Sequence, residues 1–443
     1  MRVVMLTLIP ISLLFFVGAS PVADASADGQ EFNGLDTLWI VLSAVLVFFM
    51  QAGFAMVEAG LVRSKNAANV LMKNLLDFSS ATLGYFLFGY AIMYGSEGAF
   101  SGSEGWMLLG AESPIEGVPV EAFWFFQAVF AGAAATIVAG AVAERMRFVA
   151  YLCYSFVICA LIYPLVGHWV WGGGWLAELK FHDFAGSAVV HTVGATAGLV
   201  GAMILGPRIG KFNKDGSANV IPGHNLSMVA IGAFILWFGW YGFNAGSTLG
   251  MGEPDVVARV VANTTLAPSI AAVTAMATAW KMFGKPDLTL ALNGALAGLV
   301  AITAPCASVS LGSSLVIGMV AGVLVVFGVV WLNRLRIDDP VGAVPVHGLC
   351  GIWGTLAVGI FGTEAFGAPR DGLLHGGGFD QLGIQALGVA AVVGFTAISM
   401  WIVFSVIKSV VGLRVSRETE LRGLDVDEHG HEAYAGLQMN VTD

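Results

Sequence analysis

Charged residues are scarce in this sequence. Asp, Glu, Lys and Arg make up 11 % of its 443 residues, whereas hydrophobic residues make up 57 %. Soluble domains carry roughly 25 % charged residues, so the composition excludes a water-soluble globular protein. The mean hydropathy is +0.80, and the 58 glycines suit helices that pack closely in lipid. Much of the surface must therefore face a membrane.

Cysteine is also rare. All four cysteines lie in apolar runs, and none has a suitably spaced partner for a metal. We interpret them as small core residues, and we expect neither a metal site nor another cofactor. The four are Cys153, Cys159, Cys306 and Cys350.

Long apolar runs are what the sequence does contain. Runs that can cross a hydrocarbon core of about 30 Å recur from Leu35 to Val411. The predicted fold is an all-α polytopic membrane protein with eleven transmembrane helices. We expect the spans at 36–62, 70–95, 121–143, 148–168, 185–206, 224–247, 257–281, 288–305, 312–332, 342–363 and 384–411.

The two ends of the chain differ from this pattern. Arg2 precedes an apolar stretch that ends near Ala23-Asp24-Ala25, which is typical of a cleavable signal peptide at 1–25. The alternative is an additional transmembrane helix. The segment 412–443 is polar but keeps several apolar side chains, so we expect a cytoplasmic regulatory tail that docks onto the membrane domain at 26–411.

Basic residues predict the orientation. With the mature N-terminus outside, 16 of the 20 Lys and Arg residues fall on the inner side and three on the outer side. Cytoplasmic loops are enriched in basic residues. The predicted topology therefore places the N-terminus outside and the C-terminus inside, and the expected location is a bacterial inner membrane.

One motif occurs twice, 156 residues apart. Both Asp183 to His191 and Asp339 to His347 read D-x-x-G-x-x-x-V-H, and they open the fifth and tenth spans from opposite faces. This indicates a five-plus-five inverted repeat, with halves at about 36–206 and 224–363 and an eleventh helix at 384–411. We expect each Asp to be a helix N-cap residue, with Pro340 at the first helical position.

The same repeat predicts the site. Each His lies eight residues beyond its Asp, or about 12 Å deeper along a helix, so His191 and His347 can meet near the bilayer centre. Ionisable side chains at that depth usually line a pathway. A single buried His is more often a core residue, but two in matched positions favour function.

Aromatic residues form a second group. Phe126 and Phe130 share one helix face, as do Trp240, Phe243 and Ser247, and Trp171 ends the fourth span. Aromatic stripes are most often packing or interface belts. The functional alternative is a cation–π cup for a small cation.

These residues also carry a family resemblance. The chain resembles the ammonium transporter (Amt) family from about Leu35 to Tyr434, in the bacterial Amt branch of the Amt/Mep/Rh superfamily. Trp171 and Ser247 favour that branch, because Rh-type proteins characteristically lack both. Five blocks match in order, at 183–191, 240–247, 293–299, 346–354 and 423–430. Pro345 is unusual within its block, and we expect it to bend the tenth span.

The resemblance implies a role for each candidate residue. The outer ammonium site would be Phe130, Trp171 and Ser247, the gate Phe130 and Phe243, and the pore histidines His191 and His347. Asp183 would be a structurally essential acid near the outer site and Trp240 would lie beside the pore; Phe126 and Asp339 are further supporting candidates. The substrate would be ammonium or ammonia, with methylammonium as a candidate second substrate.

Partners also follow from the resemblance. It implies a homotrimer with one pore per subunit, surrounded by lipid, and a PII-type regulatory protein on the cytoplasmic face; no nucleic acid is expected. Two rival functions are an ammonium sensor that signals through its tail and a membrane hydrolase. The tail is too short for a fused output domain, and no paired carboxylate, Ser or Cys nucleophile is evident near His191. We therefore expect a transporter with no catalytic residue.

Overall fold

The computed structural model describes residues 31–96 and 98–434. The predicted signal peptide at 1–25 and the last nine residues of the tail lie outside these residues. All the long elements in the described part are helices. They are α2 (Gly34–Leu61); α3 (Ala67–Gly84), η2 (Tyr85–Gly89) and α4 (Tyr90–Tyr94); α5 (Val120–Val142); α6 (Phe148–Val157), η4 (Ile158–Ile162) and α7 (Tyr163–Val170); η5 (Ser187–Thr192) and α9 (Val193–Leu205); α10 (Leu226–Gly246); α11 (Pro254–Phe283); α12 (Leu288–Thr303); α13 (Leu311–Arg334); η6 (Val344–Leu349) and α14 (Cys350–Phe361); and α15 (Asp380–Val410).

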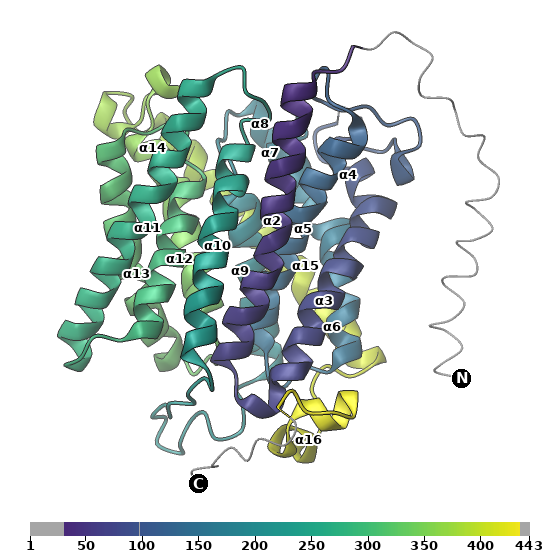
Figure 1. The fold of residues 1–443 in the computed structure, drawn as a ribbon, viewed down its shortest axis with the longest axis vertical. Helices are drawn as coiled ribbons and strands as arrows, with labels where there is room; N and C mark the ends of the chain where they lie inside the picture. The colour runs from purple at the N-terminus through teal and green to yellow at the C-terminus, as the bar shows by residue number, and fades with distance from the viewer. Residues whose placement is uncertain (1–30, 97, 435–443) are drawn as a thin grey trace.

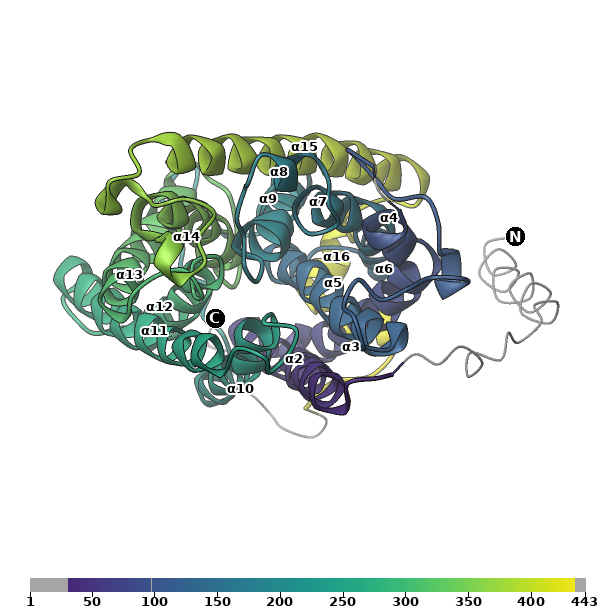
Figure 2. The same ribbon diagram turned by 90° about the horizontal axis from the view of Figure 1, so that it is seen from above.

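The predicted helical membrane fold is confirmed. Among the described residues, ten helical stretches are long and apolar enough to cross a membrane, and α12 is a shorter apolar helix of 16 residues. The helices run side by side between the two ends of the molecule (Figure 1). Seen from above, α15 lies along one edge and α2 and α10 along the opposite edge, with α5 and α9 between them (Figure 2).

Small residues allow the central helices to approach closely. A Cβ atom added to Gly194 of α9 would lie 2.7 Å from the carbonyl oxygen of Ala134 in α5. A Cβ atom on Gly232 of α10 would lie 2.8 Å from the carbonyl oxygen of Gly53 in α2. Both distances are shorter than real carbon contacts, so only glycine fits. This is the packing expected where lipid gives no hydrophobic drive between helices.

A buried ion-pair network joins three loops at one end of the molecule. Arg208, after α9, pairs with Glu144, after α5, at 2.9 Å and with Asp338, before η6, at 2.8 Å. Burial raises the pKa of Asp338, but the hydrogen bonds and charge of Arg208 outweigh burial and lower it to about 2. The end of α9 therefore lies beside the start of η6, so η5–α9 and η6–α14 run in opposite directions.

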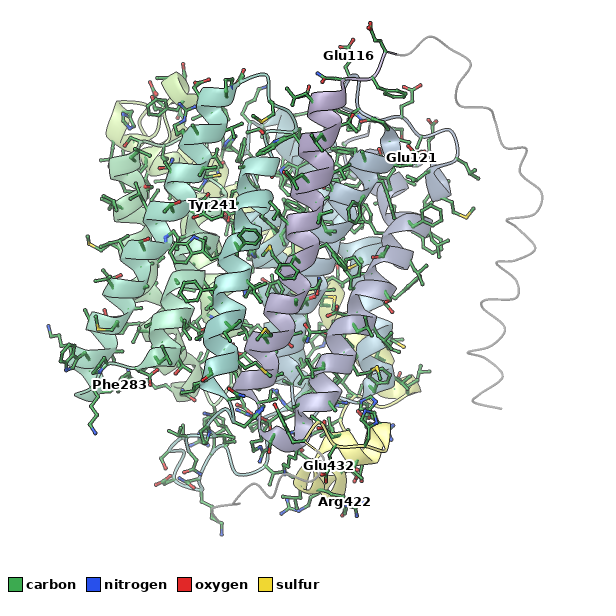
Figure 3. The ribbon with its side chains drawn as sticks, viewed as in Figure 1. Glu116, Glu121, Tyr241, Phe283, Arg422 and Glu432 are labelled. Atoms are coloured by element: carbon green, nitrogen blue, oxygen red, sulfur yellow. The ribbon has the colours of Figure 1, made fainter. Side chains whose placement is uncertain are left out.

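The tail packs against this same end, as expected. The carboxylate of Asp425 accepts the backbone N–H groups of Ala68 and Asn69 at 3.0 and 2.8 Å, which caps the start of α3. The carboxylate of Glu420, in α16 (Arg417–Arg422), accepts the N–H of Ile209 at 2.7 Å. Figure 3 shows Arg422 and Glu432 at this end and Glu116 and Glu121 at the opposite end.

Candidate functional site

The two matched motifs begin with an acid that holds a tight turn. The Asp183 carboxylate accepts four backbone N–H groups, from Gly186 and the next three residues, at 2.7–2.9 Å. The Asp339 carboxylate accepts those of Gly342 and Val344 at 3.0 and 2.7 Å. Each Asp therefore stabilises the start of a helix, where the free N–H groups and the positive end of the dipole lie.

The predicted N-cap positions are wrong in register. The helical segments begin only at Ser187 and Val344, so each Asp lies several residues ahead of its helix. Pro340 lies before the helix and is not its first residue. Gly186 (φ 116°) and Gly342 (φ 81°) explain the difference, because their left-handed backbone lets the chain turn inside the carboxylate before the helix begins.

Both histidines lie in π-helical turns, η5 and η6. Such turns often occur at functional sites. The local distortion expected at Pro345 is this π-helical geometry, but η5 has the same geometry without a proline. Proline is therefore not its only cause.

The structure brings the two histidines into contact. Nδ1 of His191 and Nδ1 of His347 are 3.2 Å apart, and the rings are 5.2 Å apart at an interplanar angle of 25°. His191 is 0 % exposed and His347 is 5 % exposed. One Nδ1 must donate and the other accept, so at least one ring offers a lone pair. Within the described residues, Nε2 of His191 has no hydrogen-bond partner and is available to a small molecule.

A stacked pair of phenylalanines lies next to the histidine pair. The rings of Phe130 (α5) and Phe243 (α10) are 4.0 Å apart and 20° from parallel. Phe243 is in turn 5.4 Å from the ring of His191, and Phe126 is 4.7 Å from Phe130. These rings and the two imidazoles form one continuous row of buried rings.

Trp240 packs against one side of this row. Its indole stacks on His191 at 5.0 Å and 22°, and its Nε1 donates to the Thr303 hydroxyl at 2.9 Å. Thr303 donates onward to the carbonyl oxygen of Leu299. The sequence analysis missed Thr303, because a single hydroxyl in an apolar helix gives no signal of its own.

The half-buried residues Trp171 and Ser247 lie next to the phenylalanine pair. The Trp171 ring is 6.4 Å from Phe130 at 80°, and its Nε1 donates to the carbonyl oxygen of Asp183 at 2.7 Å. The Ser247 hydroxyl donates to the carbonyl oxygen of Phe243 at 2.8 Å. Because that bond uses its only proton, the hydroxyl oxygen retains lone pairs for an incoming N–H donor.

Beyond His347 lies a small cavity of about 30 Å³, lined by His347, Phe54, Glu58, Val346, Asn293 and other residues. A volume of this kind holds about two water-sized molecules. The sequence analysis also missed Glu58 and Phe54. Glu58 did carry a signal, since an acid inside an apolar span is a candidate functional residue.

Comparisons with known proteins identify the family of this chain. The sequence profile of the Ammonium Transporter Family matches residues 38–434. Ammonium transporter Amt2 of Archaeoglobus fulgidus is 45 % identical, over 100 % of this chain and 97 % of its own length. Ammonium transporter 3 of Dictyostelium discoideum is 36 % identical, over 95 % of this chain and 99 % of its own length.

Solved structures have the same fold. A structure described as a Sensor Amt Protein has a TM-score of 0.84 and 39 % identity, over 89 % of this chain and 98 % of that one. The crystal structure of Candida albicans Mep2 has a TM-score of 0.81 and 29 % identity, over 88 % of each chain. The curated relatives are named as transporters and not as enzymes. This multi-pass membrane protein belongs to the ammonium transporter family.

Proposed function

We propose that this protein binds ammonium at Phe130, Trp171 and Ser247, removes a proton, and conducts ammonia past Phe243 and the paired histidines. The observation that carries the proposal is the continuous row of rings. A stacked phenylalanine pair is followed directly by two buried imidazoles in contact.

The free-energy cost of burying an ion favours a mechanism in which ammonium loses its proton before it enters the pore. Moving a bare monovalent ion into a medium of low dielectric constant has an idealised cost of order 20 kcal/mol. The aromatic cup returns about 2 kcal/mol through cation–π attraction, and the Ser247 hydroxyl about 1 kcal/mol more. Together these two contributions do not offset the cost of moving an ion between Phe130 and Phe243, which are 1 % and 0 % exposed. Neutral ammonia avoids most of this cost.

The imidazoles suit a neutral nitrogen base. Ammonia needs a donor for its lone pair and acceptors for its N–H groups, and an imidazole can supply either. Nε2 of His191 is buried without a partner in the described part of the chain. A potassium ion cannot lose a proton, so the same route rejects it.

We also propose the topology implied by the motifs and basic residues. The two D-x-x-G-x-x-x-V-H segments would belong to an inverted repeat, supported by their opposite directions and by the Arg208–Asp338 pair. The mature N-terminus would lie outside a bacterial inner membrane after removal of residues 1–25. The tail from residue 412 would lie in the cytoplasm, where the basic loops also lie.

Assembly and regulation are proposed on the resemblance. The protein would form a homotrimer, and a PII-type protein would dock on the face that carries the basic loops and the tail. The carboxylates of Asp425 and Glu420 accept hydrogen bonds from backbone N–H groups of α3 and of the loop after α9, which supports a tail that responds to changes at this face.

The second candidate function is an ammonium sensor. It is favoured by the likeness to the Sensor Amt Protein structure. Such a sensor would bind ammonium at the same cup without net flux.

A pulse of ammonium onto proteoliposomes with a lumenal pH dye tests the proposal. Conducted ammonia takes up protons inside, so the lumen should become alkaline faster than in protein-free vesicles, and potassium should give no response. Saturable ammonium binding without alkalinisation above protein-free vesicles would favour the sensor instead.

A further inference from the structure

A buried acid lies on the far side of the histidine pair from the aromatic cup. Glu58, near the end of α2, is 4 % exposed and lines the cavity of about 30 Å³ together with His347. A charged group is costly inside a membrane protein and usually faces a pathway or a partner.

Only one of the two carboxylate oxygens of Glu58 accepts a hydrogen bond within the described residues. Its Oε2 accepts one hydrogen bond, from Nδ2 of Asn74 at 3.1 Å. Over residues 31–96 and 98–434, no hydrogen bond reaches Oε1. Buried polar atoms normally have at least one hydrogen-bond partner, so this oxygen is available to a molecule in the cavity.

The charged neighbours of Glu58 leave the cavity without a fixed cation. Lys73 and Asp77 on α3 and Asp339 before η6 are the charged groups near it. Lys73 is directed elsewhere, because its Nζ donates to the carbonyl oxygen of Met146 at 2.8 Å. No Lys or Arg lines the cavity itself.

The cavity also borders a route out of the protein. Asn293, Val341 and Gly342 line both this cavity and a larger vestibule of about 420 Å³. Its wall is largely apolar but includes the charged residues Arg208, Lys211 and Asp287. A small molecule that passes His347 therefore meets Glu58 before it meets the vestibule.

We propose that this cavity is an inner subsite in which ammonia regains a proton from Glu58 and is held as ammonium beside the carboxylate. The inference rests on the proposed function. The O–H bond of the neutral carboxyl breaks and an N–H bond of ammonium forms. Ammonium then leaves through the vestibule, and the carboxylate takes a new proton from water on that side. Ammonia is a stronger base than a carboxylate, so protonation retains the substrate on the exit side.

Glu58→Gln tests the subsite. The glutamine keeps the shape and can still accept the bond from Asn74, but it cannot exchange a proton. General acids contribute about 10²–10⁴-fold to proton transfer, so we expect methylammonium uptake into proteoliposomes to fall at least about tenfold. Glu58→Asp should restore part of the uptake. The initial rate of wild-type uptake should fall as lumenal pH rises, whereas the residual initial rate of Glu58→Gln should not depend on lumenal pH.

Asp77→Asn is the matched control. Asp77 is also buried, but it accepts a hydrogen bond from the Tyr151 hydroxyl and does not line the cavity, so the uptake of Asp77→Asn should match wild type. Size-exclusion profiles and thermal unfolding check that each variant folds. Wild-type uptake in Glu58→Gln, or an equal loss in Asp77→Asn, would overturn the subsite. Failure of wild type itself to take up substrate would refute the proposed function instead.

Discussion

Replacing either of the paired histidines by alanine tests their proposed role most sharply. The direct contact between them is one hydrogen bond at 3.2 Å, worth about 1 kcal/mol net. Removing one ring also loses aromatic contacts of about 0.5–1.5 kcal/mol each and leaves a void. The total, about 2–5 kcal/mol for a large-to-small core change, is at or below the usual stability of about 5–15 kcal/mol. His191→Ala and His347→Ala should therefore still fold and assemble.

Transport should respond more strongly than folding. In the buried row between Phe243 and the cavity, the imidazole nitrogens can bond to ammonia. A lost hydrogen bond there costs about 1–3 kcal/mol, and 1.4 kcal/mol is a factor of ten in rate. We expect each Ala variant to lower ammonium-dependent uptake about tenfold or more, or to change its selectivity.

A second variant separates chemistry from shape. His191→Phe keeps a ring between Trp240 and His347 but has no nitrogen, so it should also lose transport. The exposed residue His375 provides the reconstitution control, since His375→Ala should behave as wild type. If both single His→Ala variants transported ammonium at the wild-type rate and still rejected potassium, the proposed role of the pair would be wrong.

Four further outcomes follow from the described contacts. Trp171→Leu and Ser247→Ala should shift the saturation of uptake to higher ammonium concentrations, because part of the cation–π cup or its hydrogen-bond acceptor is lost. An unchanged concentration dependence in both variants would argue against a cation site. Asp183→Ala leaves four N–H groups without their acceptor and should lower the unfolding temperature in detergent, whereas Asp183→Asn should retain part of the stability. Asp338→Asn should cost about 2.5 kcal/mol at neutral pH, because the folded pKa of about 2 lies below the unfolded value near 3.9; in thermal unfolding scans this difference should be full above about pH 4 and vanish as pH falls through about 2. Deletion of 412–443 should abolish capture of a PII protein from the same organism across effector conditions; no capture by the full chain in any condition would remove that partner.

Much of the fold was predictable because a membrane restricts the choices. The spans could be read from apolar length alone, since backbone groups in lipid must be satisfied within helices. The boundaries were less predictable. The π-helical turn of the tenth span begins at Val344, two residues after the expected start at 342, because Gly342 and the Asp339 carboxylate form a turn first.

The site was predictable where chemistry repeats in the sequence. The repeated motif alone pairs His191 with His347, and their rings are in contact. Phe130 and Phe243 were placed through the family resemblance, since aromatic spacing alone favours packing. Thr303 and the cavity beside Glu58 depend on how α2, α10 and α12 pack around η6. A single sequence does not encode those contacts as a local pattern.

Isotope-labelled ammonium uptake into voltage-controlled proteoliposomes tests the central claim most directly. The vesicles would hold an inward ammonium gradient, with an equal potassium gradient as the comparison. The account predicts uptake well above protein-free vesicles, saturating with ammonium concentration, and no potassium flux at any voltage. Ammonium uptake equal to that of protein-free vesicles, or potassium carried at a similar rate, would contradict it.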